Sequence, residues 1–338
     1  MSRAMSGRLG RFLPGPLRGL VGRGVSNLVT LHRDSEGVRR SLLNAAPAAL
    51  RAPARLLARR PTVCAVFAGR NDDFVPDNEA RVRAVVEWNS KVLSDEVVFV
   101  EWNPLPDRPL LSTQLTKDYK NLRCYVVPAE LHARVSTNPK MPVMEYHAKN
   151  VGIRRALSEY VCATNSDILW DANVRRIRRL LDERLVFRTR RVELRWDGSE
   201  PRQAYLRDPQ NRIEYRGGWR QELAYGCGDF TLAHRSLWHR ARGYDESLTG
   251  ERISCDGRGL MQLLALGGRP VQMGRHYHLF HGTSSVASGS KSHGEVFEYW
   301  ENLPYENPPD WGFGDCAEEL IAERVWQLAP ARAGAGAK

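Results

Sequence analysis

The chain has 338 residues, of which 42% are hydrophobic and 26% are charged, so it can bury a full core in one large domain or two small ones. Its formal net charge is +11, but residues 1–60 contain twelve arginines and only two acids, which leaves +1 for the remaining 278 residues. This nearly neutral remainder argues against nucleic acid as a partner, because a phosphate-binding surface gathers positive charge on the folded face that binds.

The N-terminal 60 residues are rich in Arg, Gly, Pro, Ala and Ser, and they contain no apolar run long enough to span a bilayer. We expect a basic, flexible extension. Two alternatives stay open, an organelle transit peptide and a basic arm that contacts anionic lipid. The six cysteines are widely spaced and form no CxxC pair, which indicates reduced, packing cysteines in a reducing compartment. The expected location is therefore cytoplasmic, peripheral to a membrane if the basic arm binds lipid.

Strand and helix patterns alternate from residue 61 onward. Continuous apolar runs such as Val63–Ala68 are typical of strands buried on both faces. The expected elements, in chain order, are strand 63–68, helix 78–93, strand 97–100, strand 124–127, helix 144–156 and strand 160–164. This rhythm predicts an α/β fold with a mostly parallel sheet and helices on both faces.

The pattern is less regular after residue 167. The expected elements are a short helix near 177–181, a strand at 185–187, a polar loop over 196–218, an ordered segment at 226–232, a helix over 260–266 and an apolar run at 276–281. A loop as long as 196–218 is usually a binding lid or disordered. The last ten residues are low-complexity Ala and Gly.

The strand predicted at 160–164 ends on Asn165-Ser166-Asp167. Ligands of open α/β sheets sit outside the carboxyl ends of the strands, so Asp167 is well placed to hold a metal against a phosphate. The alternative is that Asp167 caps the helix that follows.

A His278-x-x-His281 pair could supply imidazole nitrogen to the cation that Asp167 holds. His281 fits this role better than His278, and packing is the commoner fate of a histidine such as His276 or His278. A zinc site built from these histidines alone lacks a further ligand pair nearby.

Eight short motifs occur in a fixed order between residues 63 and 281. They are Gly69-Arg70-Asn71-Asp72, Val100-Glu101-Trp102-Asn103-Pro104, Lys149-Asn150-x-Gly152-Ile153-Arg154-x-Ala156, Asn165-x-Asp167, Gly228-Asp229-Phe230, Gly243-Tyr244-Asp245-Glu246, Cys255-Asp256-Gly257 and His278-x-x-His281. In this order and spacing the series resembles glycosyltransferases of the GT-A fold, near family 2.

The resemblance implies a transfer of sugar from a nucleotide-sugar donor to a hydroxyl of a glycan, lipid or small molecule. It also implies inversion at the sugar carbon and dependence on Mn²⁺ or Mg²⁺. The expected organisation is a single GT-A-like catalytic domain at 61–325, with a nucleotide-binding half at 61–167 and an acceptor-binding half at 168–325, followed by a flexible tail at 326–338.

The resemblance also implies roles for the acids. Asp167 matches the last acid of the family's Asp-x-Asp metal motif, and Asn165 replaces the first acid, which implies weaker metal binding or an Asn that faces the ribose. Asp256 resembles the general base that accepts a proton from the acceptor hydroxyl. Cys255 stands where an acid usually precedes that base, so Glu251 or Asp245 as base, and a helix-capping role for Asp256, remain alternatives.

The nucleotide is expected at the tips of the first two strands. The resemblance places Asp72 near the base and Glu101 near the base or ribose, and Arg70 could meet a phosphate. Asp229 resembles a contact to the acceptor or the donor sugar.

Two tryptophans, Trp219 and Trp238, could stack on a sugar, although buried aromatic residues more often serve packing.

Two other classes of function remain. A GT-A-like nucleotidyltransferase would share the metal and nucleotide features, but the segment after the first strand is too short and acidic for the expected phosphate loop. A non-catalytic or degenerate sugar- or nucleotide-binding module is suggested by the replacements at Asn165 and Cys255.

Overall fold

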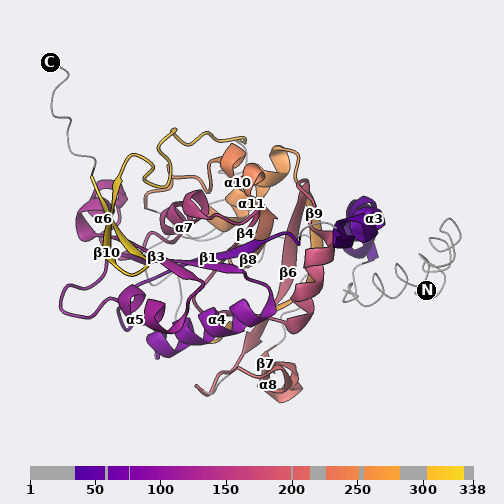
Figure 1. The fold of residues 1–338 in the computed structure, drawn as a ribbon, viewed down its shortest axis with the longest axis horizontal. Coiled ribbons are helices and arrows are strands. Elements are labelled where there is room, and N and C mark those ends of the chain that lie inside the picture. Colours follow the sequence, from indigo (N-terminus) through magenta and orange to yellow (C-terminus); the bar gives the residue numbers. More distant parts are fainter. Residues whose placement is uncertain are drawn as a thin grey trace, which may run out of the picture.

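The computed structural model describes residues 35–57, 60–75, 77–198, 201–213, 226–250, 255–281 and 303–330. Within these ranges, one mixed sheet runs through the molecule in the order β10-β11-β3-β2-β1-β4-β8-β6-β9-β5, with β7 paired to β6 (Figure 1). The strands are β1 (Val63–Gly69), β2 (Glu96–Trp102), β3 (Leu122–Val127), β4 (Tyr160–Thr164), β5 (Ile168–Trp170), β6 (Leu185–Leu194), β7 (Arg212–Ile213), β8 (Phe230–His234), β9 (Arg269–Leu279), β10 (Ala317–Ala322) and β11 (Val325–Ala329).

The four predicted strands of the first half form a parallel block. β1 pairs in parallel with β2 and with β4, and β2 pairs in parallel with β3. Successive residues of β1 pack on opposite faces, with Phe67 in one hydrophobic core and Val66 in the other, as expected of a strand buried on both sides. The predicted α/β class and mostly parallel sheet are confirmed.

Helices cover both faces of the sheet (Figure 1). One core contains residues of α3 (Ser35–Leu57), α4 (Asn78–Val92), α5 (Leu111–Asp118) and the 3₁₀ helix η2 (Ala172–Leu180). The other contains residues of α6 (Ala129–Val135), α7 (Glu145–Arg155), α10 (Arg235–Ala241) and α11 (Cys255–Ala265). Two hydrophobic cores thus hold the sheet between them, and the site described below lies at the ends of its strands.

The N-terminal boundary differs from the prediction. Residues 35–57 form α3 rather than a flexible extension, and α3 packs against β9 and η2. The Asn44 side chain donates to the carbonyl oxygen of Pro270 at 2.8 Å, and the Ser41 hydroxyl accepts from the backbone nitrogen of Gln272 at 3.1 Å. Small residues allow this close approach, and Ala48 is buried in the core. Residues 1–34 lie outside the described ranges.

The C-terminal boundary also differs. β11 pairs in parallel with β3 and antiparallel with β10, so residues 326–329 belong to the sheet and not to a flexible tail. The reason is that the chain returns to the free edge of β3, where Val325 and Leu328 are fully buried. Residues 331–338 lie outside the described ranges.

The predicted 196–218 loop contains short elements in its described part. These are α8 (Gln203–Arg207), the 3₁₀ helix η3 (Pro209–Asn211) and β7. Asp208 caps η3 by accepting from the backbone nitrogen of Gln210. Residues 214–225, which include Trp219, lie outside the described ranges.

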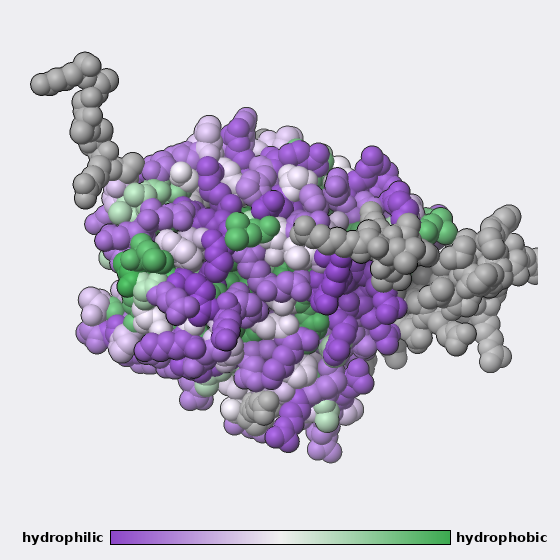
Figure 2. All heavy atoms as spheres, viewed as in Figure 1, coloured by the Kyte–Doolittle hydropathy of each residue, from purple (hydrophilic) through white to green (hydrophobic). Residues whose placement is uncertain are grey.

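All six cysteines are buried with free thiols, which agrees with the predicted packing role. The face drawn in Figure 2 is mainly hydrophilic, and apolar colour is confined to separate small patches. No helix in the described ranges has the length and apolarity that a membrane span requires.

Candidate functional site

The three predicted metal ligands meet beyond the carboxyl end of β4. Asp167 lies in the turn that joins β4 to β5, and β5 pairs antiparallel with β9 so that Ile168 is opposite His278. The backbone nitrogen of Leu279 donates to the Asp167 carbonyl oxygen at 2.9 Å. This short ladder brings the end of β9, with His278 and the following His281, beside a residue more than a hundred positions earlier.

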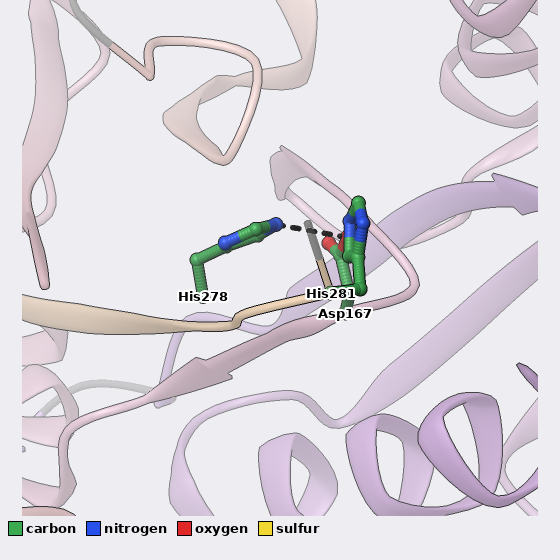
Figure 3. Close-up of side chains that lie close together, drawn as sticks. All are labelled: Asp167, His278 and His281. Atoms are coloured by element: carbon green, nitrogen blue, oxygen red, sulfur yellow. Dashed lines mark hydrogen bonds and ion pairs between the residues drawn. The ribbon is translucent and has the colours of Figure 1, made fainter. Parts of the chain in front are cut away.

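The side chains of Asp167, His278 and His281 point toward one another (Figure 3). The Nε2 atoms of both histidines lie 3.2 Å from Asp167 Oδ2, and one ligand atom from each residue falls within 4.8 Å of the other two. Asp167 Oδ1 is buried, and no hydrogen-bond partner contacts it among the residues that the structure describes. One carboxylate and two imidazoles, with a buried oxygen left over, fit a divalent transition-metal ion.

The charges in this cluster stabilise one another. Burial would raise the pKa of Asp167, but His278 and His281 outweigh it and hold that pKa well below its usual range. Burial likewise opposes a charge on His278, yet Asp167 and Glu193 raise the pKa of His278 to about 9. A metal ion that binds here must therefore displace a proton from His278.

The alternative role of Asp167 as a helix cap is wrong. The N-cap of η2 is Asp171, whose carboxylate accepts from the backbone nitrogen of Asn173 at 2.7 Å. Asp167 precedes β5 instead, four residues before that cap.

A second polar cluster surrounds Asn165 and Asp229. Asn165 Nδ2 donates to Asp229 Oδ1 at 2.9 Å, and Asn165 Oδ1 accepts from Lys149 Nζ at 2.5 Å. Asp229 Oδ2 accepts from Arg191 Nη1 at 2.8 Å and lies 3.2 Å from His276 Nε2. Both ends of the Asn165 amide are therefore engaged within the protein.

Lys149 carries the positive charge that this cluster needs. Its ammonium is fully buried and also donates to Glu145 Oε1 at 2.7 Å and to the Gly228 carbonyl oxygen at 3.0 Å. Burial opposes ionisation of Asp229, but Arg191 and His276 lower the pKa of Asp229 strongly, so it is an anion.

Asp256 lies in the first turn of α11, on the other side of Gly228. Its Oδ2 accepts from the Gly228 backbone nitrogen at 2.9 Å, and its Oδ1 accepts from the Gly257 nitrogen at 2.8 Å. Gly228 thus joins Asp256 to Lys149 and the Asn165 cluster. Because α11 begins at Cys255, Asp256 lies inside the helix and is not its N-cap, which contradicts the capping alternative.

Of the two substitute bases considered for Asp256, Asp245 is held by a buried ion pair. Asp245 Oδ2 accepts from Arg258 Nε at 2.6 Å, and Asp245 Oδ1 accepts from the backbone nitrogen of Ser247 at 2.9 Å. Asp245 thus stabilises the turn before α11. Glu251 lies outside the described ranges.

The tip of β1 lies near the histidine pair. Arg70 and Asp72 form an ion pair of 3.2 Å, and Arg70 Nε also donates to the Asn103 carbonyl oxygen at 2.5 Å. Asp72 lines an open hollow beside the start of α4, together with residues such as Asn71. The Phe74 ring centroid is 6.3 Å from that of His281. The loop after β1 therefore borders the cluster of Asp167, His278 and His281.

Glu101 is not available to a base or ribose. It is fully buried, and its two oxygens accept from the backbone nitrogens of Leu111 and Ser112, both at 2.9 Å, and from the Ser112 hydroxyl at 2.6 Å. These are the free donors at the start of α5, where a carboxylate is stabilised by the helix dipole. The prediction for Glu101 is wrong because a helix terminus occupies the strand tip.

Trp238 is also not available to a sugar. It is fully buried, and its indole nitrogen donates to the Val161 carbonyl oxygen at 3.0 Å. Packing of α10 against β4 is its role.

Three important residues escaped the sequence prediction: Lys149, Arg191 and Glu193. Lys149 stands in a quoted motif, but nothing in a single helix pattern indicates that its ammonium is fully buried. Arg191 and Glu193 are two residues apart on β6, so they lie on the same face of a strand inside the sheet. Charged residues on one face of such a strand indicate a polar site, and this was the available signal.

The chain was compared with known families, curated proteins and solved structures. No protein-family profile matches it, and none of the curated proteins does. One similar structure is a mannosyltransferase, PcManGT from Pyrobaculum calidifontis in complex with GDP-Man and Mn²⁺, at a TM-score of 0.45 and 15% identity over 82% of this chain and 76% of that one. A second similar structure is S. aureus TarS, at a TM-score of 0.42 and 15% identity over 65% of this chain and 37% of that one. A third is a mycobacterial protein, at a TM-score of 0.38 and 12% identity over 70% of this chain and 72% of that one. All three of these proteins are at most 15% identical to this chain and have TM-scores under 0.5, so they assign no family, donor, metal or acceptor to it.

Proposed function

We propose that this protein is a divalent-cation-dependent glycosyltransferase that moves a sugar from a nucleotide-sugar donor to an acceptor hydroxyl, with inversion. The observation that carries the proposal is the convergence of Asp167, His278 and His281 at the end of β4, with a buried carboxylate oxygen that has no hydrogen-bond partner within the described ranges. Binding sites of α/β sheets lie at such strand ends.

The cation would be held by Asp167 Oδ1 or Oδ2 and by the Nε2 atoms of His278 and His281. When bound, it supplies positive charge against the diphosphate that leaves the sugar. Two imidazole nitrogens favour Mn²⁺ or another transition metal over Mg²⁺, which prefers oxygen ligands.

Asp256 is proposed as the base that takes the proton from the acceptor hydroxyl. Its two oxygens accept from the backbone nitrogens of Gly228 and Gly257, which fixes the direction of the carboxylate. Asp256 is only partly buried, so its carboxylate can still contact a substrate. A fixed, partly exposed carboxylate suits a general base.

Donor recognition is proposed for the residues around Arg70 and Asp72 and for the cluster of Asn165 and Asp229. The Asn165 amide is locked by Lys149 and Asp229, so it would contact donor only through a rearrangement or through its backbone. Asp229 is an engaged anion, and its proposed part is to hold the Asn165 side chain in place and so to fix the backbone that follows β4.

The first test is calorimetric titration of Mn²⁺, with UDP, GDP or dTDP present, into the wild-type protein and Asp167→Asn. Loss of a carboxylate ligand should weaken Mn²⁺ binding by more than the roughly 10–100-fold cost of losing a supporting residue. Asp118→Asn, on the exposed surface of α5, serves as the matched control and should bind Mn²⁺ normally. Equal Mn²⁺ affinity in wild type and Asp167→Asn would remove the proposed site.

The second part of the test measures slow Mn²⁺-dependent hydrolysis across a panel of nucleotide sugars. Wild type should hydrolyse at least one donor, and Asp256→Asn should lower acceptor transfer by roughly 10²–10⁴-fold, the usual contribution of a general base. Mn²⁺ binding without any hydrolysis would favour the non-catalytic module. Near-normal transfer by Asp256→Asn would exclude Asp256 as base.

A further inference from the structure

The strand β6 carries a carboxylate on the far side of one proposed metal ligand. The register of β6 and β9 places Glu193 directly opposite His278, and Arg191 directly opposite His276. Residues two apart on a strand share a face, so these two cross-strand pairs form adjacent rows on one face of the sheet.

Glu193 contacts the nitrogen of His278 that does not face Asp167. Its Oε2 lies 2.6 Å from His278 Nδ1, while His278 Nε2 lies 3.2 Å from Asp167 Oδ2. The two ring nitrogens point in different directions, so Glu193 supports the imidazole from behind and does not join the group of candidate ligand atoms.

Arg191 holds Glu193 in place. Arg191 Nε donates to Glu193 Oε1 at 2.6 Å, and Arg191 Nη1 donates to Asp229 Oδ2 at 2.8 Å. Each Glu193 oxygen therefore has a partner among the described residues, and both the Glu193 and Arg191 side chains are less than one-fifth exposed. A carboxylate restrained in this way has little freedom to turn from the imidazole.

We propose that Glu193 is a positioning residue, which keeps the proton of His278 on Nδ1 and so presents the Nε2 lone pair to the cation. This inference rests on the proposed metal site of Asp167, His278 and His281. A carboxylate that accepts from the second nitrogen of a ligand histidine fixes its tautomer and ring orientation and makes it a better donor. Arg191 extends the same chain of contacts to Asp229, which links the cation site to the Asn165 cluster.

The test uses Co²⁺ as the metal probe in the full-length protein, because its visible absorption reports both binding and ligand geometry. Glu193→Ala should weaken Co²⁺ binding about 10–100-fold, the typical cost of losing such a partner. Glu193→Gln, which can still accept from Nδ1 through its amide oxygen, should retain part of the affinity. Glu183→Ala, at an exposed position before β6, is the matched control and should bind as wild type does.

A second readout separates positioning from general stability. In the Zn²⁺-bound protein labelled with ¹⁵N-histidine, NMR should place the His278 proton on Nδ1, and Glu193→Gln should weaken or shift that signal. A lower melting temperature with unchanged Co²⁺ affinity, spectrum and tautomer would overturn the proposal. If Glu193→Ala does not fold, Glu193→Gln decides alone, and wild-type Co²⁺ affinity in that variant would overturn it.

The experiment also separates this inference from the proposed function. Co²⁺ binding that is lost in Asp167→Asn but unchanged in both Glu193 variants would overturn the positioning role and leave the metal site standing. Absence of Co²⁺ binding by the wild-type protein would overturn both.

Discussion

At the scale of single residues, Glu246 is a largely buried acid that joins two distant segments. Its Oε1 accepts from Asn150 Nδ2 at 2.9 Å, on α7, and from the Gly312 nitrogen at 2.8 Å. Burial raises the pKa of Glu246 to about 7, although both hydrogen bonds favour the charged form. The folded protein therefore keeps a proton on Glu246 at pH values where the unfolded chain has lost it.

Glu246 is therefore expected to lower the free energy of unfolding as pH rises, and Glu246→Gln should remove this effect. Below about pH 4.5 the acid is protonated in both states, and between pH 4.5 and 7 only the unfolded state ionises, so Glu246 lowers stability as pH rises. Above pH 7 this lowers the free energy of unfolding by at most roughly 3–4 kcal/mol. Urea denaturation should show Glu246→Gln matching wild type at pH 4.5 and exceeding it at pH 8. Exposed Glu319→Gln is the control, and an equal difference at both pH values would contradict the prediction.

At the scale of elements, α7 is the helix that brings the site's polar residues to the sheet. It supplies Lys149 to the Asn165 cluster, while Asn150 accepts from the Tyr244 nitrogen at 2.7 Å and donates to the Tyr244 carbonyl oxygen at 2.8 Å. The helix can lie this close to β1 because Gly152 has no Cβ. A Cβ at this position would lie 2.4 Å from Val66 Cγ1, which is too close. Glycine here permits the contact of helix and strand.

Gly152→Ala should therefore destabilise the protein by about 1–3 kcal/mol, since overpacking outweighs the gain of about 1 kcal/mol in helix propensity. Urea denaturation measures the loss. Adding Val66→Ala removes the clashing methyl group, so the double mutant should be more stable than the sum of the two single effects predicts. Simple additivity would show that the contact with Val66 is not the cause.

At the scale of the whole molecule, the chain's last strands complete the sheet that its first strands begin. β11 lies beside β3, and the segment before it is held to α7, where the Arg154 side chain donates to the carbonyl oxygen of Trp311 at 3.0 Å. β10 and β11 form an antiparallel hairpin, and β10, the outermost strand, is exposed along most of its length. An apolar patch of Figure 2 lies over this hairpin.

Two leucines of this hairpin should behave differently. Leu328 is fully buried, so Leu328→Ala should cost about 2–5 kcal/mol and lower the midpoint of the unfolding of the entire domain. Leu320 is 62% exposed, and Leu320→Ala should change stability by less than about 0.5 kcal/mol. Thermal and urea unfolding measure both. A separate early transition in Leu328→Ala would show that the hairpin is not part of the cooperative core.

The sequence by itself determined the parallel block, because the runs at 63–68, 97–100 and 124–127 are apolar at every position and the run at 160–164 at all but its last, and only a sheet covered on both faces buries them. It also singled out Asp167 through its place after such a run. Only the tertiary structure decided that the ends of β5 and β9 pair, and that β6 stands beside β9. Such pairings join residues far apart in the chain, 110 positions for Ile168 with His278 and 85 for Glu193 with His278, and leave no local periodicity. For the same reason Glu101, alike in pattern to Asp167, went instead to the start of α5, and Glu193, with no motif of its own, came to lie behind His278.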